Sequence, residues 1–259
     1  MRLRPLRRHA SETGRRAPTP QRTHEELRAV FASEIDLHLT AVSPRTRAVL
    51  RDLVQHEWFP GSTDPGGIAV LLAIVRGIQP RLVLELGTLV GFSALCIADV
   101  LEHNNVKGEL VTVDPTAEGH AVAAEFLEHA DLSHRVRFVR GLSTDPLVAA
   151  ELLELGPFDL VYLDSSHSYA GTLQELDLLF DRGGWVGETG LLVAHDAAPD
   201  AAAFDPTGAG GVPRALAEWV GARRDEYDLF VLAPPLWPNG CGLGLLQRRR
   251  GRREERSVT

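Results

Sequence analysis

Two short polar stretches, each directly after an apolar run, carry the side chains best suited to chemistry. The run "FDLVYL" leads into Asp164, and His167 follows three residues later. A second run, "GLLVA", leads into His195 and Asp196. Carboxylates and imidazoles can bind a divalent cation, and a histidine with a pKa of about 6.5 can accept a proton near neutral pH. A polar turn or a helix cap is the ordinary alternative for each residue.

These stretches lie within a regular alternation of short apolar runs and amphipathic segments. Strands are expected over residues 81–87, 108–114, 135–141, 158–164, 190–196, 227–233 and 240–248. Helices are expected over residues 23–39, from 44 onward, and over 68–78, 92–104, 119–130, 145–156, 169–184 and 211–224. Such alternation indicates a parallel sheet with helices on both faces. Because "PPLWPN" is too short for a crossover, the last two strands should form an antiparallel hairpin.

The ends of the first three expected strands could bind a ligand, since open α/β sheets bind ligands beyond the carboxyl ends of their strands. In "ELGTLVGFS", Gly87 and Gly91 permit a tight turn. Leu89 replaces the middle glycine of a dinucleotide fingerprint, and no phosphate-cradling Gly-Lys-Ser/Thr follows. Asp114 ends the second strand 23 residues after Gly91 and could accept hydrogen bonds from ribose hydroxyls. Ser143 could face an adenine, although a plain turn fits equally well.

The stretch "VLELGTLVGFSALCIA", with "TVD" downstream, resembles the first motifs of small-molecule O-methyltransferases. The resemblance covers about residues 65–248 and implies a Rossmann-like class I fold that binds S-adenosylmethionine (SAM). This fold has a mostly parallel seven-stranded sheet with an antiparallel C-terminal hairpin, and residues 23–64 would add a helical cap. The resemblance implies that SAM is bound by Glu85, Gly87, Thr88, Gly91, Ser93, Asp114, Ser143 and Asp164.

The region around Asp164 resembles a narrower group within these enzymes. "DLVYLDSSHSYAGTLQELDLL" and "GGWVGETGLLVAHDA" are similar to macrolide sugar O-methyltransferases and the cephalosporin hydroxylase group. This resemblance implies a Mg²⁺ site formed by Asp164, His195 and Asp196, with His167 as the catalytic base and Asp164 beside it. The sequence departs from those sugar enzymes at His195, where they carry a glutamate, so a different metal or none is also compatible.

Composition limits the other classes of function. The net charge of −8 combines about +6 on residues 1–22, +4 on residues 248–259 and about −18 between them. The arginine-rich ends, residues 1–22 and 249–259, are expected to be disordered, solvated tails. Binding of nucleic acid by these tails is disfavoured, because the acidic body would repel the phosphate backbone. No apolar run reaches the roughly 18 residues that a membrane span requires. Cys96 and Cys241 are interpreted as core thiols of a cytoplasmic protein.

The sequence therefore predicts a cytoplasmic, SAM-dependent O-methyltransferase, assembled as a homo-oligomer. Its acceptor would be a hydroxyl of a small natural-product or sugar-like metabolite, with magnesium assistance and no membrane or nucleic-acid partner. Three alternatives stay open at this point. They are N-methylation without a metal, a hydroxylase-like enzyme on the same fold, and a non-catalytic protein that binds SAM or nucleic acid.

Overall fold

The computed structural model describes residues 23–182, 184–233 and 241–249. The expected tails, residues 1–22 and 250–259, lie outside this part of the chain. Arg249, at the start of the expected C-terminal tail, is described and places its Nε 2.8 Å from Asp228 Oδ1. None of the described helices is long and apolar enough to cross a membrane.

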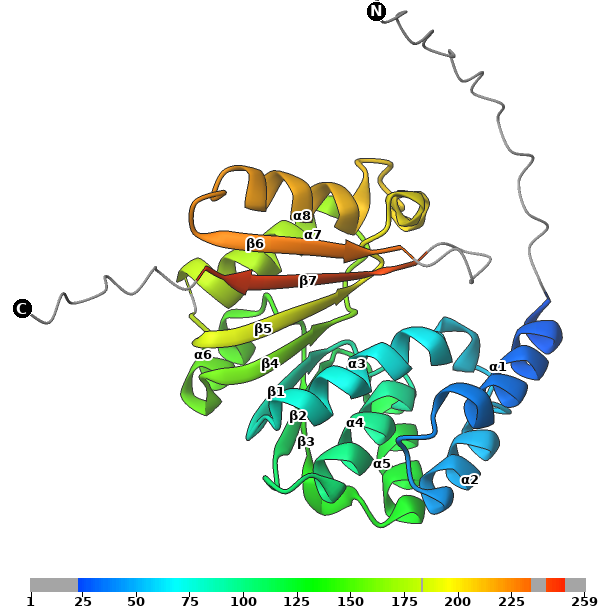
Figure 1. Cartoon of the computed structure of the whole chain (residues 1–259). Coiled ribbons are helices and arrows are strands. Elements are labelled where there is room, and N and C mark those ends of the chain that lie inside the picture. The colour runs from blue at the N-terminus through cyan, green and yellow to red at the C-terminus, as the bar shows by residue number, and fades with distance from the viewer. Residues whose placement is uncertain (1–22, 183, 234–240, 250–259) are drawn as a thin grey trace, which may run out of the picture.

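The centre of the molecule is a seven-stranded sheet in the order β3-β2-β1-β4-β5-β7-β6 (Figure 1). Strands β1 to β5 run parallel, and β7 pairs antiparallel with both β5 and β6. This arrangement confirms the expected mostly parallel sheet with an antiparallel C-terminal hairpin. The strands are β1 (Leu82–Leu86), β2 (Glu109–Asp114), β3 (Val136–Arg140), β4 (Phe158–Leu163), β5 (Val186–His195), β6 (Tyr227–Leu232) and β7 (Leu243–Arg248).

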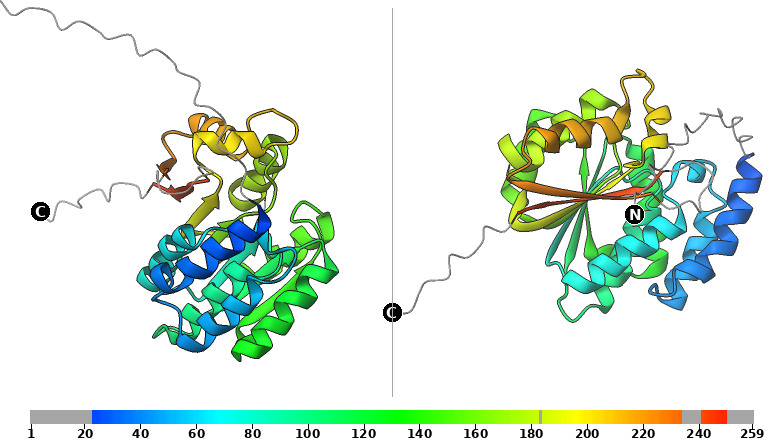
Figure 2. Two further views of the ribbon diagram at one scale, coloured as in Figure 1. Left: turned by 90° about the vertical axis from the view of Figure 1, so that its right-hand side faces the viewer. Right: turned by 45° about the horizontal axis from the view of Figure 1, so that its top comes forward.

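Helices cover both faces of this sheet, as the alternation in the sequence predicts (Figure 2). The helices α3, α4 and α5 pack on one face, and α6, α7 and α8 pack on the other. The helices α1 and α2 pack outside α3, α4 and α5. The helices are α1 (His24–His38), α2 (Pro44–Leu53), α3 (Pro65–Ile78), α4 (Phe92–His103), α5 (Ala117–Ala130), α6 (Pro146–Leu155), α7 (Tyr169–Leu176) and α8 (Gly211–Gly221).

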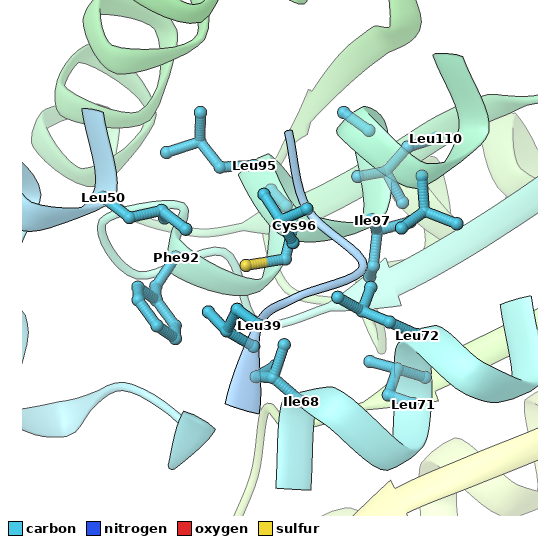
Figure 3. Close-up of a cluster of buried hydrophobic side chains, with 14 of the residues drawn as sticks. Leu39, Leu50, Ile68, Leu71, Leu72, Phe92, Leu95, Cys96, Ile97 and Leu110 are labelled. Atoms are coloured by element: carbon cyan, nitrogen blue, oxygen red, sulfur yellow. The ribbon is translucent and has the colours of Figure 1, made fainter. Parts of the chain in front are cut away.

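The core has two layers because successive strand residues point to opposite faces. In β1, Val83 packs in the layer beneath α3 to α5, and Leu84 packs in the layer beneath α6 to α8. Figure 3 shows the first layer around Cys96, which is fully buried as expected. Leu39 and Leu50 reach this cluster from the N-terminal helices. The N-terminal cap therefore shares one hydrophobic core with the sheet.

Two helices and one strand differ most from the expected boundaries. Strand β5 begins at Val186, four residues before the expected start at residue 190. Helix α3 begins at Pro65, three residues early, because Asp64 caps it by accepting a 2.8 Å hydrogen bond from the amide of Gly67. The expected helix over residues 169–184 is α-helical to Leu176 and continues as a π-helical segment, η3 (Asp177–Arg182). Short 3₁₀ helices occur at η1 (Phe59–Gly61), η2 (Ser133–Arg135) and η4 (Pro199–Phe204).

Candidate functional site

A cavity of about 650 Å³ opens at the carboxyl ends of strands β1 to β4. This is the edge at which an open α/β sheet binds its ligands, and the volume is in the usual range for a small-molecule site. Every one of the four strand ends contributes to the wall, and so does the segment before α3. The lining includes Gly61, Ser62, Thr63, Gly87, Thr88, Leu89, Ser93, Asp114, Ser143, Asp164, Ser165, His167, Gln174 and Glu175.

The turn after β1 requires its glycines for reasons of chain packing. Gly87 has a φ of +103°, and a Cβ there would lie 2.1 Å from the carbonyl oxygen of Asp164. Gly91 has a φ of +84°, and a Cβ there would lie 2.6 Å from Ala123 Cβ. Gly87 also lines the cavity, whereas Gly91 packs against α5 behind the cavity wall. Leu89 adopts a φ of +47°, which is uncommon for a residue with a side chain.

Asp114 ties this turn to the end of β2. Its Oδ2 accepts hydrogen bonds from the backbone amides of Thr88 at 3.1 Å and Leu89 at 3.0 Å. Its Oδ1 accepts from the amide and hydroxyl of Thr116 at 2.8 and 2.5 Å. Asp114 lies in the cavity wall, at the position where the sequence predicts contact with a ribose.

Glu85 lies beneath the turn and is fully buried. Thr88 and Thr112 share a 2.6 Å hydrogen bond between their hydroxyls, and Thr112 donates to Glu85 Oε2 at 2.5 Å. Burial raises the pKa of Glu85 to about 7, although hydrogen bonds from Ser93 and Thr112 partly oppose the shift. Ser93 and Thr88 line the cavity, whereas Glu85 lies behind them and does not line it.

The four ionisable residues at the ends of β4 and β5 lie together, and we call them the acid–imidazole cluster: Asp164, His167, His195 and Asp196. The pairing of Leu163 with Ala194 places Asp164 level with His195. His195 Nδ1 lies 3.2 Å from Asp164 Oδ1 and 3.3 Å from Asp196 Oδ1. The strand ends thus bring together every residue for which the sequence predicts a metal or base role.

Each carboxylate of the cluster has one oxygen held by a neighbour and the other directed at His195. Asp164 Oδ2 accepts hydrogen bonds from the hydroxyls of Thr63 at 2.6 Å and Tyr162 at 3.2 Å. Asp196 Oδ2 lies 2.8 Å from His167 Nδ1. Asp196 has a φ of +56°, a left-handed conformation that is uncommon for a residue with a side chain.

Electrostatics within the cluster favours positive charge between the two carboxylates. Burial lowers the pKa of His195, but Asp164 and Asp196 outweigh this effect and hold the pKa well above its ordinary value. The hydrogen bond to Asp196 likewise raises the pKa of His167. Burial would raise the pKa of Asp196, yet the two imidazoles hold it well below its usual range. The two carboxylates therefore favour the charged form of both imidazoles.

The buried carboxylate of Glu175, on α7, lines the cavity, and its role was not predicted from the sequence. Glu175 Oε1 accepts 2.6 Å hydrogen bonds from the hydroxyls of Ser143 and Ser165, which follow β3 and β4. Glu175 thereby joins two loops of the cavity wall. A single acidic residue within an expected helix is too common to signal this role. The neighbouring Ser166 shares a 2.9 Å hydrogen bond with the hydroxyl of Ser168, which caps α7.

The interpretation of Cys241 as a core thiol is wrong. Cys241 is only partly buried, and its sulfur lies in a group with His195 and Asp196 whose ligand atoms are all within 4.8 Å of one another. Residue 241 lies two residues before the start of β7, and β7 inserts between β5 and β6, so the hairpin brings the thiol to the site. Its surroundings in the sequence, apolar and glycine-rich, favour a core position and give no sign of this contact.

The donor set at the cluster fits a divalent cation. The side chain of His195 is 8% exposed, its Nδ1 faces the two carboxylates, and its Nε2 has no hydrogen-bond partner among the described residues. A buried polar group without such a partner is costly, and a cation would satisfy it. Asp164 and Asp196 each direct one oxygen to His195 Nδ1 and have the other oxygen held from outside. Among the described residues, the ligand atoms of His195, Asp196 and Cys241 all lie within 4.8 Å of one another, and Asp164 does not belong to that group.

The sheet order and the cavity at its carboxyl edge define a class I methyltransferase fold. An O-methyltransferase of Bacillus cereus, solved in complex with S-adenosylhomocysteine (SAH), superposes with a TM-score of 0.67 at 19% identity. The superposition covers 88% of this chain and 100% of that one.

Sequence comparison is in agreement. Residues 84–197 match the family model described as a methyltransferase domain. The chain is 38% identical over 104 residues to a catechol O-methyltransferase of Mycobacterium tuberculosis, covering 40% of this chain and 44% of that protein. It is 31% identical over 106 residues to a catechol O-methyltransferase of Niastella koreensis, covering 40% and 46%. The match thus spans less than half the length of these relatives. Residues 84–197 thus match a methyltransferase domain, and the proteins to which this part of the chain is similar are O-methyltransferases.

Proposed function

We propose that this protein transfers a methyl group from SAM to a hydroxyl of a small natural-product or sugar-like metabolite. The observation that carries the proposal is the position of Asp164. This residue lines the cavity that fits the cofactor, and its carboxylate belongs to the acid–imidazole cluster. The site for the methyl donor and the site for acceptor chemistry therefore meet at one residue. The names of the similar proteins support the same reaction class.

SAM fits the cavity on chemical grounds. The turn after β1 offers backbone, hydroxyl and carboxylate groups and contains no lysine for a phosphate. Thr88, Ser93 and Asp114 would contact the methionine and ribose parts, and Ser143 would lie near the base. Glu85 would act indirectly, through its hydrogen bond with Thr112.

The cation proposed for the cluster would be held by Asp164, His195 and Asp196. When bound, SAM supplies a methyl group on a positively charged sulfur, and the cation supplies stabilisation of negative charge on the acceptor oxygen. Thr63, Tyr162 and His167 keep the two carboxylates in place.

His167 is the proposed proton acceptor. Its side chain is 48% exposed and lines the cavity, and the contact of Nδ1 with Asp196 fixes the orientation of the ring. The free nitrogen, Nε2, would take the proton of the acceptor hydroxyl. A positioned base of this kind typically contributes about 10²- to 10⁴-fold to the rate.

The test is methyl transfer from SAM to a panel of catechols, simple phenols, methyl glycosides and matched amines, followed by mass spectrometry. We expect methylated hydroxyls, loss of turnover after treatment with a chelator, and recovery when a divalent cation is restored. Methylation of amines alone, unaffected by the chelator, would instead establish the metal-free N-methyltransferase.

The role of His167 has its own control. Substitution His167→Gln should lower kcat by about 10²-fold or more while SAH affinity stays unchanged. His129→Gln, at an exposed position on α5, should leave both quantities as in the wild type. A loss of SAH affinity with unchanged kcat in His167→Gln would exclude the base role.

A further inference from the structure

The contact between Cys241 and the acid–imidazole cluster bears on which metal the protein can bind. Cys241, His195 and Asp196 offer a sulfur, a ring nitrogen and a carboxylate oxygen within 4.8 Å of one another. A cysteine near a site is not by itself a ligand. The ring of His195, in the same group, is almost wholly buried, and its Nε2 has no hydrogen-bond partner among the described residues, although its Nδ1 faces Asp164 and Asp196. This buried Nε2 is the independent indication that a ligand belongs there.

The backbone around Cys241 is fixed against the end of β5. The amide of Ala198 donates to the carbonyl of Cys241 at 2.9 Å, and the amide of Ala197 donates to the carbonyl of Gly242 at 3.4 Å. Gly242 has a φ of +66°, and a Cβ there would lie 2.6 Å from Ala198 Cβ. A glycine is therefore required for Cys241 to approach the residues that follow His195 so closely.

The distances within the cluster suit a small tetrahedral site. Ligand atoms bonded to a tetrahedral zinc at about 2.0 to 2.3 Å lie roughly 3.3 to 3.8 Å from one another. His195 Nδ1 lies 3.2 and 3.3 Å from the facing oxygens of Asp164 and Asp196, which matches this spacing. The sulfur of Cys241 lies within 4.8 Å of the His195 and Asp196 ligand atoms, so these three donors form the group that a metal would draw together, while Asp164 lies outside that group and faces His195 alone.

The chemistry of these donors disfavours magnesium. Mg²⁺ binds oxygen ligands in near-octahedral geometry and keeps several of its waters. A set with one imidazole and one thiolate favours ions such as Zn²⁺ or Co²⁺, which accept nitrogen and sulfur readily. The histidine at position 195, in place of an acidic residue, and the thiol of Cys241 thus both favour ions such as Zn²⁺ or Co²⁺ over Mg²⁺.

We propose that Cys241 is a metal ligand, and that the cluster binds a transition ion of the Zn²⁺ or Co²⁺ type in preference to Mg²⁺. This inference rests on the cation assignment of the proposed function, and it adds the fourth donor and the class of metal. On binding, the thiol proton of Cys241 leaves to solvent and a sulfur–metal bond forms, with no change of oxidation state.

The experiment is optical titration of the metal-free, full-length protein with Co²⁺. We expect visible d–d bands and a near-ultraviolet charge-transfer band from thiolate to cobalt. Cys241→Ser should abolish the charge-transfer band and weaken Co²⁺ binding by at least about tenfold, the lower limit for losing even an outer-shell partner. Cys96→Ala, which removes the other thiol, should keep the band. A stoichiometric amount of Zn²⁺ should displace Co²⁺, and a large excess of Mg²⁺ should not.

Calorimetry with SAH, run on every variant, separates the possible failures. Unchanged SAH affinity in Cys241→Ser shows that this variant is folded. Cobalt bound without a charge-transfer band, or displaced by Mg²⁺, would overturn the assignment of Cys241 and leave the proposed cation site in place. SAH binding without any Co²⁺ binding would overturn both the Cys241 assignment and the proposed cation site.

Discussion

Glu85 is a buried carboxyl group whose protonation depends on folding. Its pKa is about 7 in the folded protein against an ordinary 4.5, because burial disfavours the charged form. Between these pH values the carboxyl group of Glu85 binds more protons in the folded state than in the unfolded chain, so its contribution to stability is greatest below pH 4.5 and falls as the pH rises through 7. The difference corresponds to about 3 kcal/mol.

We therefore expect Glu85→Gln to remove this dependence on pH. In urea unfolding, the free energy of the variant should gain about 3 kcal/mol relative to the wild type between pH 4.5 and 8. Glu188→Gln, at an exposed position in β5, should follow the wild-type curve at every pH. Parallel curves for Glu85→Gln and the wild type would show that the carboxyl is ionised throughout.

Asp114 and Asp159 provide a matched pair for testing cofactor binding. Both carboxylates accept hydrogen bonds from backbone amides, Asp114 at the carboxyl edge of the sheet and Asp159 at the opposite edge. Asp114→Ala should weaken SAH binding by about tenfold or more, since a hydrogen bond to a charged group contributes about 1.5 to 3 kcal/mol. Asp159→Ala should leave SAH affinity unchanged in calorimetry, and equal affinities in the two variants would exclude a ribose contact by Asp114.

Single residues were predictable where they end a strand. Asp164, His195 and Asp196 follow apolar runs, and parallel strands end at the same edge, so their proximity follows from the alternation of elements alone. Thr63 and Cys241 were missed because they reach the cluster from segments whose placement depends on tertiary packing. Thr63 precedes α3, and Cys241 depends on β7 lying next to β5.

At the level of elements, α7 holds the cavity wall together. Glu175 bonds to the loop after β3 through Ser143 and to the loop after β4 through Ser165. Glu175→Ala should lower SAH affinity about tenfold, since two hydroxyls of the wall lose their acceptor. Glu175→Gln keeps an acceptor oxygen and should restore affinity to within a few-fold of the wild type. Equal losses in both variants would mean that the charge, and not the hydrogen bonds, matters.

The element boundaries show which signals are local. Capping residues such as Asp64 and Ser168 are visible in the sequence and fix helix starts to within a few residues. The π-helical segment η3 and the early start of β5 have no comparable capping or breaking residue that would have predicted them from the sequence. Strand pairing was predictable for the hairpin, but the position of β7 inside the sheet requires the complete topology.

The charge distribution of the whole molecule leads to a further prediction. The arginine-rich ends flank a strongly acidic body, which disfavours binding of a phosphate backbone. A variant lacking residues 1–22 and 250–259 should keep SAH affinity and turnover within a few-fold of the full-length protein. Retaining Arg249 preserves its contact with Asp228. A mobility shift of duplex DNA at physiological salt, abolished by the deletion along with turnover, would favour a nucleic-acid substrate.

The close approach of Gly87 to the carbonyl of Asp164 has a consequence for engineering the enzyme. A Cβ at Gly87 would collide with that carbonyl, so the backbone of the turn after β1 lies directly against the backbone of Asp164 in the acid–imidazole cluster. The backbone contact between Gly87 and Asp164 would thus set the separation of the proposed methyl donor and methyl acceptor. The segment around Thr63 and the loop beyond Phe204 border the cluster from outside this contact. Variant libraries aimed at new methyl acceptors should vary those two segments and keep Gly87 and Asp164 unchanged.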